Sequence, residues 1–71
     1  MMVTVARCGD IREAVRLRMA LESHGIAAFI PDEYMASIDL PIFFTPSGVR
    51  VQVAEEDVEA AQRIIREQQA S

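Results

Sequence analysis

The chain has 71 residues, of which 51% are hydrophobic and 25% are charged, and this balance is that of one folded domain rather than a disordered segment. Its formal net charge is −4 and its seven basic residues are scattered arginines, which argues against a binder of phosphate backbones and so against nucleic acid as a partner. Cys8 is the only cysteine, so an internal disulfide and a cysteine-rich zinc site are both excluded.

The small size of the chain has a consequence for stability. A domain of this length buries only about 60% of the surface that its unfolded form exposes, so the monomer is expected to be marginally stable. Oligomerisation or a bound ligand is the expected supplement. The sequence has no recognisable signal peptide and no apolar run near the roughly 18 residues of a membrane span, so we expect a cytoplasmic protein without a membrane partner.

The N-terminal third predicts a strand followed by a helix. Residues 2–6 (MVTVA) include three consecutive β-branched residues, which is typical of a strand with at least one buried face. Asp10 and Glu13 form a D-x-x-E capping box, which predicts a helix from about Ile11 to Ser23 or His24. Gly25 then offers the left-handed conformation that commonly ends a helix.

The rest of the chain predicts two more strands and a second helix. Residues 26–30 (IAAFI) form a short apolar run before Pro31, which indicates a strand. Residues 48–54 (GVRVQVA) alternate valines with polar residues, which indicates a strand with one buried face. Three acids at residues 55–57 favour the start of a helix, and we expect it to end near Gln68.

This order of elements predicts an α+β fold of the ferredoxin-like split β-α-β type. The third strand is expected in the middle of a three-stranded sheet, in the order 1-3-2, with both helices on the valine-bearing face. Because no fourth strand follows the last helix, the first strand is expected to keep an open edge. We interpret residues 1–71 as a single domain with a long apolar loop at 31–47.

Several positions in this order resemble a family of short bacterial proteins. The family pattern has Glu-Ala in the first helix, Leu-Glu near its end, Gly-Ile before the second strand, Asp-Glu after it, Gly-Val at the third strand and acids at the last helix. In this chain the matching positions are Glu13, Ala14, Leu21, Glu22, Gly25, Ile26, Asp32, Glu33, Gly48, Val49, Glu55 and Glu56. The family is named as putative prokaryotic signal-transducing proteins, and the likeness spans nearly the whole chain. It implies a role like that of small ferredoxin-like regulators. Some relatives carry a zinc-ribbon-like addition that this chain lacks.

Residues capable of nucleophilic catalysis are few. Cys8 precedes a helix N-terminus, where the helix dipole could lower the pKa of a thiol. The only imidazole, His24, stands at the far end of the same helix, so a structural thiol is the favoured interpretation. His24 itself suits hydrogen bonding at a helix C-terminus. We therefore expect no enzyme, because no acid-base pair, nucleophile constellation or cofactor motif is present.

The acids of the loop are weak candidates for metal ligands. Asp32, Glu33 and Asp39 could share a hard cation through their oxygens, but the spacing of a calcium loop is absent and no histidine assists. A turn or the cap of a short helical turn is the favoured interpretation of Asp32 and Glu33. We expect neither a metal nor a cofactor.

The loop 31–47 is the main candidate for a binding segment. It carries large apolar side chains, so it is too apolar to lie in water, and ordering so many residues on its own is costly. We expect it to pack partly on its own sheet and partly on a second subunit or bound partner; the alternative is a loop folded wholly onto its own core. The residues predicted to contact a partner or effector are Asp32, Glu33, Tyr34, Met35, Ile38, Phe43 and Phe44.

The first helix predicts two apolar rows. Ala14, Leu17 and Leu21 form the row expected to face the sheet. A second row, made of Ile11, Val15 and Met19, is either a widening of the core face or a contact surface between subunits. Symmetric pairing of two first strands would extend the sheet across such a dimer.

These features favour a small non-catalytic regulatory or protein-interaction module that acts as a homo-oligomer, most simply a dimer. The alternative is a sensor of a small effector, with a pocket between the loop 31–47 and the sheet. The effector and any protein partner are not identified by the sequence.

Overall fold

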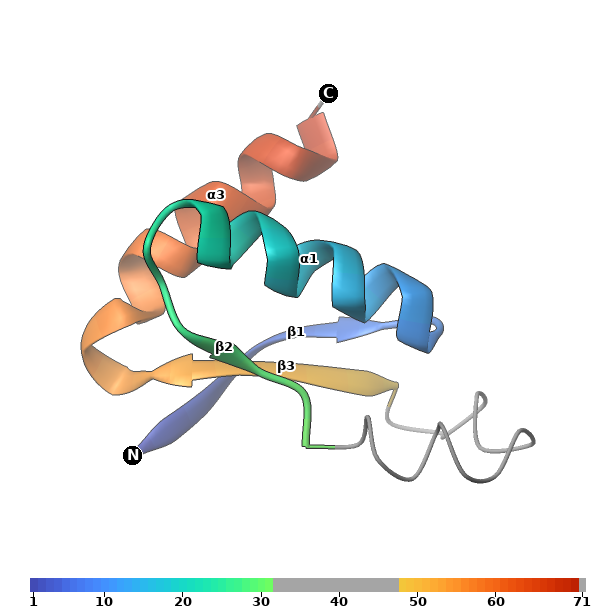
Figure 1. The fold of residues 1–71 in the computed structure, drawn as a ribbon, viewed down its shortest axis with the longest axis horizontal. Helices are drawn as coiled ribbons and strands as arrows, with labels where there is room; N and C mark the ends of the chain where they lie inside the picture. Colours follow the sequence, from blue (N-terminus) through green and yellow to red (C-terminus); the bar gives the residue numbers. More distant parts are fainter. Residues whose placement is uncertain (32–47, 71) are drawn as a thin grey trace.

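The structure, a computed structural model, describes residues 1–31 and 48–70 (Figure 1). The elements are β1 (Met2–Cys8), α1 (Ile11–Ser23), β2 (Ala28–Phe29), β3 (Val49–Ala54), a 3₁₀ turn (Glu55–Asp57) and α3 (Val58–Ala70). The strands form one sheet in the order β1-β3-β2, and both outer strands run antiparallel to β3. The predicted α+β fold and strand order are therefore confirmed.

Both helices lie over the same face of the sheet, as Figure 1 shows. The three valines of β3 are essentially inaccessible and form the floor of the core. Ala14, Leu17 and Leu21 are the buried residues of α1, as the predicted sheet-facing row requires. The buried apolar residues are Cys8, Ala14, Leu17, Leu21, Ile26, Ile30, Val49, Val51, Val53, Ala61, Ile64 and Ile65.

Strand β1 is two residues longer than expected and contains a β-bulge. Its register against β3 shifts by one residue at Val5. Beyond the bulge, Cys8 lies opposite the buried Val49. Strict alternation from Val3 would instead turn Arg7 toward this apolar face, because side chains alternate along a strand. The bulge thus keeps a charge out of the core while the strand continues to pair.

Strand β2 is shorter than expected. The sequence predicts a strand over residues 26–30, but only Ala28 and Phe29 pair with β3. Ile26 belongs instead to the end of α1, because its N–H donates to the carbonyl of Leu21 at 3.0 Å. With the bond from the Gly25 N–H to Glu22, this makes a Schellman motif, and Gly25 has the expected positive φ of 81°.

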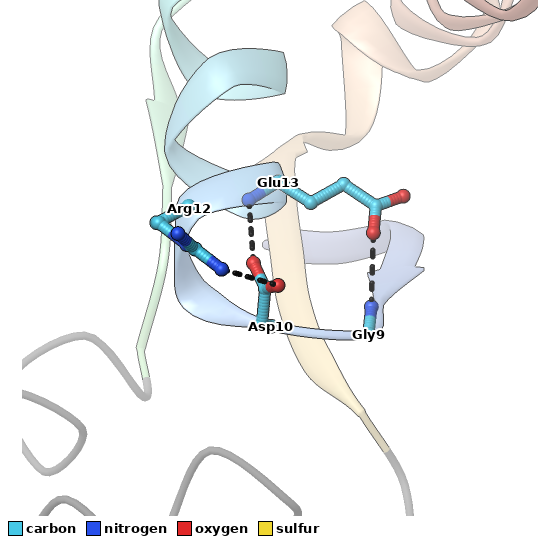
Figure 2. A network of polar contacts seen from close by, with 4 residues as sticks. All are labelled: Gly9, Asp10, Arg12 and Glu13. Atoms are coloured by element: carbon cyan, nitrogen blue, oxygen red, sulfur yellow. Dashed lines mark hydrogen bonds and ion pairs between the residues drawn. The ribbon is translucent and has the colours of Figure 1, made fainter.

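The start of α1 has the predicted cap with one difference. The N–H of Glu13 donates to Oδ1 of the N-cap Asp10 at 3.0 Å (Figure 2). In a standard capping box the glutamate side chain accepts a hydrogen bond from the N–H of the cap residue. Here Glu13 Oε2 accepts instead from the N–H of Gly9, at 3.2 Å. The box therefore ties the helix to the end of β1.

The C-terminal helix begins with a turn of different geometry. Residues 55–57 form a 3₁₀ turn, and the α-helix starts at Val58 and continues two residues past the predicted end. Ala61 and Ile65 are buried, and Val58 packs partly buried against the core. Ile64 is buried as well. In residues 1–31 and 48–70, neither helix is long and apolar enough to cross a membrane.

Candidate interaction surface

The sheet face opposite the helices carries exposed apolar side chains. In an antiparallel pair, residues directly opposite each other share a face. Gln52 alternates with the buried valines of β3, so it faces away from the helices, and its register partners Thr4 and Phe29 do the same. Phe29 is 57% exposed and Met2, next to this row, is 45% exposed. This open face therefore offers an aromatic ring that the core does not use.

Sequence reasoning missed Phe29 as a site residue although the necessary signal was present. Ile26 and Ile30 are buried and Ala28 packs against the core, so the even positions of this run face inward. The same alternation places Phe29 outward. The sequence alone could therefore have indicated an aromatic residue at an outward-facing position of this strand.

Polar side chains complete the open face. Gln52 Nε2 donates to Thr4 Oγ1 at 3.1 Å, which links β1 to β3 across the sheet. Arg7 lies directly opposite Arg50 in the register, so two positive charges stand side by side where β1 ends and β3 begins. Both arginines have interaction partners.

The edge of β1 is the second part of this surface. Among the described residues β1 pairs with β3 only, so no second strand from residues 1–31 and 48–70 lies along its other side. An unpaired strand edge is a template for another strand. The bulge at Val5 interrupts that edge near its middle.

Gly48 explains how closely β3 approaches β1 at this end. Its φ is +79°, and a Cβ placed on it would lie 3.0 Å from the carbonyl oxygen of Cys8 and 3.3 Å from Cβ of Arg7. Only glycine avoids both the strained backbone and this contact. The open face and the β1 edge therefore depend on Gly48 for their geometry.

Cys8 lies in surroundings that keep its thiol protonated. The residue is 3% exposed, and burial raises the pKa of its thiol to about 11, with smaller contributions from the negative charges of Glu13 and Asp10. The low thiolate population disfavours nucleophilic chemistry at neutral pH. This environment is that of a structural cysteine.

The polar cluster at the start of α1 serves the helix. The hydrogen bond from the Glu13 N–H lowers the pKa of the Asp10 carboxyl, and Arg12 adds to the effect. Arg12 Nη2 lies 3.7 Å from Asp10 Oδ2 in an exposed ion pair (Figure 2). Such surface pairs contribute little to stability. The hollow that these residues line with Arg16 is therefore accounted for by capping.

His24 occupies the other end of the same helix. Its Nδ1 lies 2.9 Å from the carbonyl oxygen of Ala20, so the proton resides on Nδ1 and is donated to that oxygen. Ser23 Oγ donates to the same carbonyl at 2.7 Å. The side chain thus makes the hydrogen bond at the helix C-terminus that the sequence led us to expect.

The residues predicted as contacts belong to two segments, the loop 31–47 and the helix α1. Asp32, Glu33, Tyr34, Met35, Ile38, Phe43 and Phe44 lie outside the described residues, as does Asp39 and the pocket suggested between the loop and the sheet. In the helix row, Ile11 and Val15 are half-buried against the core, whereas Met19 is 61% exposed. In the part of the chain that the structure describes, no three His, Cys, Asp or Glu residues gather as metal ligands would.

A comparison with known protein families matches residues 2–69 to the family described as "Putative prokaryotic signal transducing protein". The chain belongs to this family. The resemblance inferred from the residues is therefore confirmed over nearly the whole chain. No curated protein and no solved structure gives a significant match.

Proposed function

We propose that this family member is a small non-catalytic regulatory module that works by binding and forms a homodimer through its sheet. The observation that carries the proposal is the seven-residue β1 edge, which has no second partner strand within residues 1–31 and 48–70. The signal-transducing description of the family agrees with a binding role.

The small core of this domain supports the proposal of self-association, because a larger buried surface would stabilise the fold. The described core contains twelve buried apolar residues, and seven further hydrophobic residues pack only partly against it. Phe29 and Met19 remain exposed. Pairing two β1 strands would satisfy backbone groups on both edges and cover apolar surface beside them. A dimer would therefore add stability that a 71-residue monomer lacks.

The chemistry of the described side chains favours binding over catalysis. The one buried group that could act as a nucleophile, Cys8, has a raised pKa. The acid at the start of α1 has its carboxylate occupied by a backbone N–H, and the histidine at the other end is occupied by a backbone carbonyl. The carboxylate and the imidazole therefore stabilise the ends of α1. Within residues 1–31 and 48–70, the open face of the sheet has no comparable structural role.

A pair of proline substitutions tests the edge. The N–H groups of adjacent strand residues point to opposite sides, so one of Val3 and Thr4 donates toward β3 and the other toward the open edge. Proline removes the donor in either case. We expect one of Val3→Pro and Thr4→Pro to be clearly less stable than the other. The more stable variant should have lost only the outer donor, and it should be monomeric.

The measurement is light scattering coupled to size-exclusion chromatography, with stability followed by urea denaturation. The wild type is expected to associate at chain concentrations of about 100 µM, because an interface of one strand edge belongs to the small and weak class. A monomeric wild type would overturn the proposal. So would a more stable proline variant that associates as the wild type does.

A further inference from the structure

The bulge in β1 changes the side to which the residues of the strand point. Val3 and Cys8 lie opposite buried valines of β3, so both face the helices. Val5 and Ala6 are consecutive, yet both pack against the core, so both also face the helices. Residues of a regular strand alternate between the two faces, and two successive residues on one face are what a bulge produces.

The other two residues of this part of β1 point away from the helices. Thr4 lies opposite Gln52, and its Oγ1 accepts a hydrogen bond from the side chain of that residue. Arg7 lies opposite Arg50, which alternates with the buried valines of β3. Both Thr4 and Arg7 are therefore on the open face of the sheet.

The directions of the side chains in residues 3–8 form a pattern that reads the same both ways. In chain order the side chains point toward the helices, away, toward, toward, away and toward. The midpoint of this pattern is the peptide bond between Val5 and Ala6. In a strand without a bulge, any such midpoint would fall on a residue, because the alternation is unbroken.

From this pattern we infer that β1 of a second copy pairs antiparallel with β1 in a single register, in which the two-fold axis of the dimer passes through the Val5–Ala6 bond. The inference rests on the proposed function, since it specifies how the second copy lies along the same edge. Residues directly opposite each other in an antiparallel pair share a face of the sheet. A pattern that reads the same both ways meets this requirement when the second strand is reversed about its midpoint.

In the inferred register, every residue of 3–8 lies opposite a partner residue that points to the same side. The opposite pairs are Val3 with the partner's Cys8, Thr4 with the partner's Arg7, and Val5 with the partner's Ala6. A shift by one residue in either direction sets Thr4 opposite a residue that faces the helices. Larger shifts either break the agreement as well or leave no more than three residues of each β1 paired.

Parallel pairing of the two strands does not give a closed dimer with a continuous sheet. The two-fold axis of a parallel pair would run along the strands and would turn one copy over relative to the other. Each residue would then stand beside its own copy with the two side chains on opposite faces. Neighbouring strands of a sheet keep their pleats in phase, so residues side by side point to the same face. The antiparallel pair meets this condition and places both helix layers on one side.

The same pattern favours a second copy over an unrelated strand as the partner of β1. A regular strand would agree with β1 on one side of the bulge only, or it would have to shift register there as β3 does. A second β1 needs no such shift. Bulges on an edge discourage indiscriminate pairing, and this bulge leaves the edge complementary to itself.

Cysteine cross-linking tests the register, in chains whose native thiol is removed by Cys8→Ala. One chain carries Thr4→Cys and the other carries Arg7→Cys. Directly opposite residues of an antiparallel pair lie about 4.5–5.5 Å apart between Cα atoms, within the range of a disulfide. Like positions of the two copies would lie three residues apart along the strands, or roughly 10 Å, which is beyond that range.

After oxidation with diamide, we expect the one-to-one mixture to give about tenfold more disulfide-linked dimer than either chain alone. Mass spectrometry identifies the product, with one of the two chains isotope-labelled. The matched control replaces Thr4→Cys by Met2→Cys, which lies on the same face two residues away. Its diagonal distance to the partner's Arg7 is about 7–8 Å, so this mixture should link no better than the single chains.

Circular dichroism checks that each variant is folded. If Arg7→Cys or Cys8→Ala does not fold, Val3→Cys in an otherwise unchanged chain replaces the mixture, because Val3 lies opposite the partner's Cys8. This variant should form a dimer with two disulfides.

The outcomes separate the register from the proposed function. If the wild type associates but Thr4→Cys links to its own copy as readily as to Arg7→Cys, or no predicted pair links, the register is wrong. The pairing of the edge is then still decided by the two proline variants. If the wild type is monomeric, the proposed function fails, and the register fails with it.

Discussion

The three glycines show at the scale of single residues how the backbone fixes this fold. Gly25 and Gly48 both have positive φ, at 81° and 79°. A Cβ on Gly25 would meet nothing within 4 Å, whereas one on Gly48 would lie 3.0 Å from a backbone oxygen of β1. Gly9 has no such conformation, and a Cβ there would meet only Glu13 Oε2 at 3.7 Å. A side chain would therefore meet backbone strain alone at Gly25, strain and a close contact at Gly48, and neither at Gly9.

Alanine substitution at these glycines is expected to give graded losses in the free energy of unfolding. Gly9→Ala should change it by less than about 0.5 kcal/mol, since neither strain nor a clash results. Gly25→Ala should cost about 1–2 kcal/mol through the left-handed backbone alone. Gly48→Ala should cost more than Gly25→Ala, because the contact with β1 adds to the same strain. Urea denaturation measures all three, and equal losses at Gly25 and Gly48 would contradict the close approach of β3 to β1.

Single residues also show why parts of the candidate surface could not be read from the sequence. Asp10, Glu13 and Gly25 act locally, within a few residues, so their roles as caps were predictable. The facing of Arg7 was not, because it depends on a bulge whose position is set by pairing with β3. The open position of Phe29 was available from alternation. Its exposure, however, depends on which elements cover the sheet.

At the scale of the elements, long periodic segments were predicted well and short ones were not. The limits of α1 and the alternation of β3 follow from strong patterns, and both agree with the structure. The apolar run 26–30 was predicted as a strand, but the Schellman motif of α1 takes its first residue and only two residues pair. Ile26 and Ile30 of that run are buried by the core without pairing in the sheet, and composition alone does not distinguish such residues from those of a strand.

The bulge in β1 leads to a prediction at this scale. Deleting Val5 would leave six residues of β1 opposite the six residues of β3 in regular alternation, with Cys8 still opposite Val49. We expect the deletion to keep the fold and to cost about 1–2 kcal/mol, the contribution of a partly buried valine. Insertion of an alanine after Val5 adds a second unpaired residue and should cost more. Urea denaturation of the two variants checks the order, and a deletion more damaging than the insertion would refute the register of β1 against β3.

At the scale of the whole molecule, the two faces of the sheet differ: one packs against the helices and the other is open. The helix layer and the valines of β3 form the core, and the polar groups at both ends of α1 are used by its caps. We propose that the other face and the β1 edge make contacts with further chains. The proposed self-association would stabilise this 71-residue chain, and it would at the same time provide the binding role of a regulatory module.

The most direct test of this account is hydrogen exchange of the backbone amides at low and high protein concentration. We predict that outward-facing amides of β1 become more protected as concentration rises, because each then donates to a second β1. Amides of β3, whose two neighbours are already in place, should show no such gain beyond that of the whole fold. Exchange in β1 that is independent of concentration, in a protein that remains folded throughout, would contradict the claim that this edge is the interface.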